Sequence, residues 1–156
     1  MSVSDLRATH RPLLPGLPAH GQLRRLALGG APGTVRHCRA FTRLALHDWG
    51  WLPTEEPERQ AHADDVLLIV SELVTNACRH AGGGELFGVR GTVGLLRIEV
   101  ADHEPAPPAL RRPQPGAAAG GYGLRTVALL ADRWGSTPHT DRPGKTVWAE
   151  FDLPRA

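Results

Sequence analysis

A long segment without glycine or proline is the strongest constraint on the fold. The chain holds 18 glycines and 14 prolines among its 156 residues, yet residues 60–81 contain neither. At 3.6 residues per turn, this segment makes about six helical turns. It lies between the proline-containing stretch 50–58 and the glycines at 82–84. The sequence therefore predicts one long helix that begins near residue 60 and ends at these glycines.

The remaining elements follow from the spacing of apolar residues. Spacings of three and four predict an amphipathic helix over 34–49 and a shorter helix over 122–130. Gly91 is expected to separate the two middle strands of a hairpin. The predicted strands are residues 23–28, 85–90, 92–101, 133–138 and 145–153. In the last strand the residues that alternate on one side are Val147, Ala149, Phe151 and Leu153.

The order of these elements predicts the fold class. The strands and helices do not alternate as repeated βαβ units. This order favours an α/β fold of the α+β sandwich type, with one mixed, mostly antiparallel sheet and helices packed on one of its faces. Residues 1–21 contain three prolines and are predicted to form a flexible tail, with one domain over 22–156. Residues 103–121 are proline-rich and aperiodic, so we expect a lid loop over a site.

Composition excludes several classes of protein. The apolar fraction of 41% and the charged fraction of 22% are ordinary for a globular protein, and no apolar stretch is long enough to cross a bilayer. The N-terminus lacks the features of a secretory signal, so we expect a cytoplasmic protein. Cys38 and Cys78 are predicted to be buried thiols. A net charge of +2 with scattered arginines, and no aromatic platform, disfavours a nucleic-acid binder.

Two polar residues on the long helix are candidates for metal and proton chemistry. Glu72 and Asn76 are four residues apart, so their side chains share one face of the helix. An Asn carbonyl oxygen suits Mg²⁺, which prefers few protein oxygens, and a neighbouring Glu can accept a proton. The alternative is a solvated helix face, where such pairs are common.

Asp102 and two glycine motifs follow the helix in the chain. Asp102 comes directly after an apolar strand, where its carboxylate could accept a hydrogen bond from a base or simply cap the turn. The segment GGYGL at 120–124 opens a helix, so its backbone amides could point at phosphate oxygens, although a hinge would look the same. GKT at 144–146 then opens the last strand. The ordered set is more specific than any one member.

With these motifs in this order, the sequence resembles the GHKL ATPases, which include gyrase-type ATPases, histidine kinases and anti-sigma-factor kinases. SELVTNA at 71–77, followed by RHA at 79–81, resembles the family's N box. AGGYGL at 119–124 and ADRWG at 131–135 are similar to the second glycine box and the residues after it in small actinobacterial members. GKTVWAE at 144–150 resembles their closing strand. The resemblance implies a Bergerat-type ATP-binding fold with a lid loop.

The resemblance also implies roles for individual residues, with ATP and Mg²⁺ as cofactors. Asn76 would chelate Mg²⁺, Glu72 would be the general base, and Asp102 would bind the adenine amino group. The implied mechanism is Mg²⁺-dependent phosphoryl transfer, which depends chiefly on positioning and charge neutralisation.

The glycine box and the closing strand would complete the nucleotide site. Gly121 and Gly123 would meet the phosphates, with Leu124 beside them, and Thr146 would support the adenine.

The box after Asp102 departs from the family pattern. Where the family has alternating glycines, this chain has His103, Glu104 and Pro105. Glycine permits close backbone approach to a ligand, so Glu104 and Pro105 would reshape or stiffen this wall of the pocket.

The leading hypothesis is a serine/threonine protein kinase of the anti-sigma-factor type. Such a protein phosphorylates a small STAS-type antagonist and alternately binds a sigma factor, and so regulates transcription. The second hypothesis is a regulator of the same fold that binds protein partners with impaired catalysis. A detached histidine-kinase catalytic domain is disfavoured, because no dimerisation helix pair is present. Related proteins commonly dimerise, but the sequence leaves the oligomeric state open.

Overall fold

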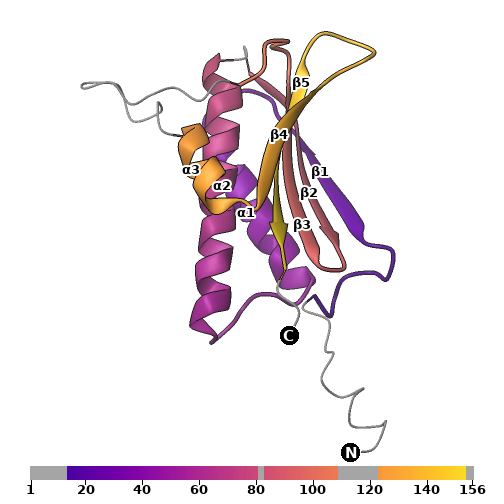
Figure 1. The fold of residues 1–156 in the computed structure, drawn as a ribbon, viewed down its shortest axis with the longest axis vertical. Helices are drawn as coiled ribbons and strands as arrows, with labels where there is room; N and C mark the ends of the chain where they lie inside the picture. The colour runs from indigo at the N-terminus through magenta and orange to yellow at the C-terminus, as the bar shows by residue number, and fades with distance from the viewer. Residues whose placement is uncertain (1–13, 81–82, 109–122, 154–156) are drawn as a thin grey trace, which may run out of the picture.

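The computed structural model describes residues 14–80, 83–108 and 123–153, and Figure 1 shows their fold. One five-stranded sheet, with strand order β1-β2-β3-β5-β4, carries the helices on one of its faces. The predicted fold class is confirmed, and every described strand pair is antiparallel rather than mixed. The strands are β1 (Gln22–Ala27), β2 (Gly84–Thr92), β3 (Leu95–Asp102), β4 (Arg133–Pro138) and β5 (Lys145–Asp152).

The helices lie close to their predicted positions. They are α1 (Thr34–Asp48), α2 (Pro57–His80) and α3 (Gly123–Leu130). α2 begins earlier than the predicted residue 60, because proline fits the first turn of a helix, where its missing N–H costs nothing. The Gln60 N–H already donates to the Glu56 carbonyl oxygen over 3.0 Å. Figure 1 shows α3 beside the C-terminal half of α2.

The hairpin turn differs from the prediction. It lies at Gly94, which has a φ of +81°, and not at Gly91, which is inside β2 and pairs with Gln22 and Leu96. A Cβ at Gly91 would lie 3.0 Å from the Trp49 ring. Gly91 therefore serves the close packing of α1 against the sheet, and the prediction that it breaks the strand was wrong.

The core lies between the helices and the sheet. Alternate strand residues face the helices, as the period of two in a strand requires. The Phe41 and Phe87 rings meet edge to face, with centroids 6.0 Å apart, so α1 is fixed against β2. The apolar strand residues with at most 2% exposure are Phe87, Val89, Leu96, Ile98, Val100, Ala149 and Phe151.

The described part of the predicted tail contacts the end of α1. Leu14 is buried in the core, and the Gly16 N–H donates to the Trp49 carbonyl oxygen over 3.0 Å. Leu17 also packs against this core. Residues 14–21 therefore pack near the end of α1, and the boundary at residue 21 stays a prediction. Residues 1–13, and residues 109–121 of the predicted lid, lie outside the described part of the chain, as does residue 122.

The two cysteines lie in different environments. Cys38 is buried on α1, and burial, with a smaller contribution from Cys78, raises the pKa of its thiol to about 12. Cys78 is exposed on α2, so the prediction of two buried thiols was wrong for this residue. None of the described helices combines the length and the apolar character needed to cross a membrane.

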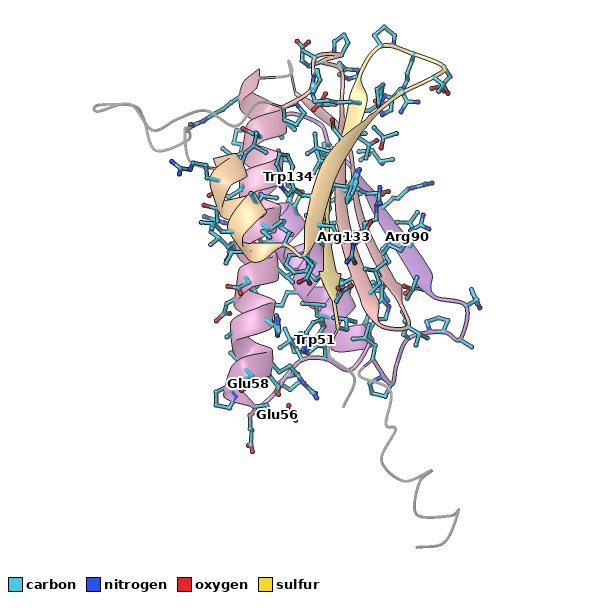
Figure 2. The ribbon with its side chains drawn as sticks, viewed as in Figure 1. Trp51, Glu56, Glu58, Arg90, Arg133 and Trp134 are labelled. Carbon is cyan, nitrogen blue, oxygen red and sulfur yellow. The ribbon has the colours of Figure 1, made fainter. Side chains whose placement is uncertain are left out.

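The face of the sheet opposite the helices is polar. Arg97 lies 4.6 Å from the centre of the Trp148 ring and forms ion pairs with Glu99 at 3.2 Å and Glu150 at 3.0 Å. In Figure 2, Trp134 lies on the helix side of the sheet, and its neighbour Arg133 lies on the other side. We call this polar surface the open face.

Candidate functional site

Asp102 and Lys145 form a buried ion pair at one end of the sheet. They are directly opposite each other in the β3–β5 ladder, and Lys145 Nζ lies 3.1 Å from Asp102 Oδ1. Only 4% of the Asp102 side chain and 6% of the Lys145 side chain are exposed. The alternation along β3, in which Val100 faces the helices, places Asp102 on the same side. A charged pair therefore stands where the apolar core ends.

The residues after Asp102 fold back on the same carboxylate. The Glu104 N–H donates to Asp102 Oδ1 over 3.0 Å, and Lys145 Nζ donates to the Glu104 carbonyl oxygen over 2.9 Å. Asp102 thus caps its own turn, as the simpler of the two interpretations expected, and also presents a buried charge. Both of its described contacts fall on Oδ1.

Gly144 allows β5 to start this close to Asp102. Its φ is +118°, and a Cβ at this position would collide with the Asp102 carbonyl oxygen. Only glycine combines this conformation with this approach. The glycine before the last strand therefore positions Lys145 beside the carboxylate.

Glu72 and Asn76 lie on α2 in the half that leads to the same end of the sheet. Both side chains are half-buried, at the border of the face that Leu73 and Ala77 turn to the core. A Cβ at Gly84 would lie 3.6 Å from the Ala77 side chain, and Gly84 pairs with Asp102. The end of α2 therefore reaches the strand ends that carry the ion pair. In Figure 2 the labelled Glu58, in the first turn of α2, marks the opposite end of this helix.

The oxygens of Glu72 and Asn76 remain available for a ligand. Neither side chain has a hydrogen-bond or ion-pair partner among the described residues. The described residues also contain no group of three or more His, Cys, Asp or Glu that could hold a metal ion. A single Asn oxygen therefore fits a metal that takes most of its ligands from water and phosphate, as Mg²⁺ does.

The second glycine motif is only partly described. Gly123 is the first residue of α3, and Leu124 is buried at 7% exposure. α3 packs against α2, so the start of α3 belongs to the same side of the sheet as Glu72 and Asn76. Gly121 lies outside the described residues, and its role stays a prediction.

The side chains of Thr146 and Asp102 lie on opposite faces of the sheet. It pairs with Ala101 in the ladder, so its side chain lies on the open face. Thr146 Oγ1 is 3.0 Å from His139 Nε2, and both line a hollow of about 170 Å³ that also includes Arg25 and Arg142. The resemblance gave Thr146 a place at the adenine, but the strand alternation turns it away from the helix side.

Lys145 is the site residue that the sequence reasoning missed. The predicted alternation of Val147, Ala149 and Phe151 already placed Lys145 on the core side of the last strand, and Thr146 on the other. A lysine in phase with a buried apolar row is rarely left without a partner. That signal, together with the Asp at the end of the neighbouring strand, could have indicated the pair.

Comparisons with known proteins concern the family and the fold of the chain. The profile of the histidine kinase-like ATPase domain family matches residues 31–151. Among solved structures, the chain is similar to the crystal structure of the RsbU and RsbW domains of Rv1364c from Mycobacterium tuberculosis, with a TM-score of 0.61 and 18% identity. The match covers 86% of this chain and 33% of that one, so this chain spans about a third of its length. No curated protein matches the chain significantly.

Proposed function

The chain belongs to the family of histidine kinase-like ATPase domains, and on that basis we propose that it binds ATP with Mg²⁺ between α2, α3 and the end of β3. The proposed activity is that of a serine/threonine protein kinase of the anti-sigma-factor type. The observation that carries this proposal is the buried Asp102 carboxylate at the end of β3, on the same side as Glu72 and Asn76.

Each residue has a role that suits its position. Asp102 accepts a hydrogen bond from the adenine amino group, because a carboxylate without surrounding water is a strong acceptor. Asn76 holds Mg²⁺ through its side-chain oxygen, and Glu72, one helical turn earlier, accepts the proton of the attacking hydroxyl. Bound Mg²⁺ neutralises the phosphate charge. Gly121 and Gly123 offer backbone amides to the phosphates, and Leu124 packs beside the nucleotide.

The proposed partners are proteins of a phosphorylation switch. Phosphoryl transfer to a serine of a small STAS-type antagonist would alternate with binding of a sigma factor, in the cytoplasm, and so regulate transcription. The shared fold with the structure containing an RsbW domain supports this proposal, which goes beyond the family assignment.

The Asp102–Lys145 pair favours a second candidate function. A regulator that binds proteins but has lost efficient catalysis would tolerate a base-binding carboxylate that is already occupied. In that case the altered residues 103–105 and the buried lysine would both belong to a disabled nucleotide site.

Calorimetric titration of ATP with Mg²⁺ into the full chain tests the proposal. We expect saturable binding in the parent protein and at least a tenfold weaker affinity in Asn76→Ala, because one metal ligand is lost. Gln60→Ala is the matched control, since it removes an exposed amide from the opposite end of the same helix. Absence of binding in the parent would overturn the nucleotide site.

A second measurement separates the two candidate functions. ATP turnover by the parent protein, lost in Glu72→Gln while ATP still binds, would support the kinase. Binding without turnover or phosphoryl transfer would support the protein-binding regulator.

A further inference from the structure

Lys145 occupies the carboxylate that the proposed function assigns to adenine. Its ammonium contacts Asp102 Oδ1 at 3.1 Å, inside the protein. We propose that Lys145 is a built-in competitor for Asp102, which limits nucleotide affinity and must yield when the adenine amino group binds. This inference rests on the proposed function, because it concerns the same carboxylate.

The chemistry of the two competing donors favours the lysine. Both donors would make a charge-assisted hydrogen bond to the carboxylate. The adenine amino group is neutral, however, so only the ammonium adds the attraction between opposite charges, which is stronger in a buried site than in water. A neutral amino group that takes the place of the ammonium would also leave a buried positive charge without its counter-ion. Adenine therefore binds Asp102 at the expense of a stronger contact.

The burial of the pair makes the competition direct. The side chains are only 4% and 6% exposed, so water offers little help to either group when the contact breaks. The chain has 18 Lys and Arg residues, and Lys145 is the single lysine among them. A compact ammonium on a flexible stem can leave such a position, whereas a planar guanidinium is harder to move.

Lys145 also ties the neighbouring loop to the carboxylate. It donates to the Glu104 carbonyl oxygen over 2.9 Å, and the Glu104 N–H donates to the same Asp102 oxygen. Release of Lys145 would therefore loosen the turn at 102–104, where this chain departs from the glycine-rich pattern of its relatives. The lysine and the altered box act on the site together.

The test compares nucleotide affinity in the parent chain and in Lys145→Met, which keeps the apolar stem and removes the charge. We expect ATP to bind roughly tenfold more tightly, or better, because a hydrogen bond to a charged group contributes more than 1 kcal/mol. The matched ligand is purine riboside triphosphate, which lacks the 6-amino group. Its affinity should change little, because it does not compete for Asp102.

Two further variants keep the test decisive. Lys145→Gln keeps a neutral donor beside Asp102, so it should fold even where Lys145→Met does not, and should give a smaller gain for ATP. Lys145→Met combined with Asp102→Asn should lose the gain, because the contested carboxylate is absent. Circular dichroism before each titration confirms that the variants are folded.

The outcomes separate this inference from the proposed function. Unchanged or weaker ATP binding in both folded lysine variants would overturn the competition, and weaker binding would mean that Lys145 contacts the nucleotide. An equal gain for both nucleotides would also overturn it. The proposed function would survive each of these results, provided that the parent binds ATP and Asn76→Ala binds it at least tenfold more weakly. No ATP binding in the parent or in any lysine variant would instead reject the site itself.

Discussion

Each face of the sheet holds an ion pair, one buried and one exposed to water. On the helix side, Lys145 and Asp102 meet at 3.1 Å with almost no exposure. On the open face, Arg133 and Asp152 meet at 2.6 Å, but 49% and 60% of their side chains are exposed. Loss of one partner should destabilise the protein less in the shorter, exposed pair, because water solvates the charge that remains, whereas loss of one partner from the buried pair leaves a charge without a counter-ion. The distance between the charged atoms therefore does not indicate which ion pair matters more to stability.

The apolar residues show the same contrast between the faces. Phe87 is fully buried against α1, whereas its neighbour Leu86 is half-buried beside the hollow on the open face. Adjacent residues of one strand thus lie on opposite faces, one in the core and one at the surface. The consequence is that stability should depend on the face a side chain occupies more than on its position in the chain.

The largest expected effect comes from adjacent substitutions in β2. Phe87→Ala should lower the free energy of unfolding by roughly 3 to 5 kcal/mol, because it opens a cavity against Phe41. Leu86→Ala should cost about 1 kcal/mol or less. Urea denaturation of both variants measures the difference. Similar losses would contradict the assignment of the two faces.

The next effect concerns the buried ion pair. Lys145→Ala should lower the free energy of unfolding by roughly 3 kcal/mol, because it leaves the Asp102 carboxylate buried without a counter-charge. The combined variant Lys145→Met, Asp102→Asn should recover most of that loss, since neither charge remains. Thermal and urea denaturation of both proteins measure this. A double variant as unstable as the single one would show that the charges do not matter to the fold.

The smallest effect is expected for Asp152, and it depends on pH. The hydrogen bond from Arg133 holds the pKa of the Asp152 carboxyl below its ordinary value of 3.8. A lowered folded-state pKa stabilises the protein above the unfolded value, and this stabilisation is lost as the pH falls below about 4. Asp152→Asn should therefore be slightly less stable at neutral pH and should approach the parent protein in acid. A parallel pH dependence of the two unfolding midpoints would contradict this.

Local sequence rules predicted most of the elements for a physical reason. The period of two in β5 and the period of 3.6 in α1 and α2 arise from the backbone of one segment, so they can be read without the rest of the chain. The order of these elements then restricted the fold to a sheet with helices on one face. The resemblance likewise used local motifs, which is why Glu72, Asn76 and Asp102 could be singled out.

The features that the sequence did not predict depend on contacts between segments that are distant in the chain. Gly91 was predicted to be a turn because glycine breaks strands, but its lack of a side chain serves the Trp49 ring. Residues 1–21 were predicted to form a flexible tail because prolines and few periodic apolar positions occur there, and the hydrogen bond from the Gly16 N–H to the Trp49 carbonyl oxygen had no signal in that pattern. Neither contact has a local signal.

The sequence by itself determined the elements, their order and the family, because periodicity and motifs are properties of short segments. Only the tertiary structure decided that Lys145 faces Asp102, since that contact requires the register of β3 against β5 and the close approach allowed by Gly144. The placement of Thr146 on the open face, by contrast, already follows from the alternation within β5. Register depends on hydrogen bonds between strands that are more than forty residues apart in the chain, as the separation of 43 between Asp102 and Lys145 shows. The apolar pattern within one strand fixes the face that each residue occupies, but it does not say which residue of the neighbouring strand lies opposite.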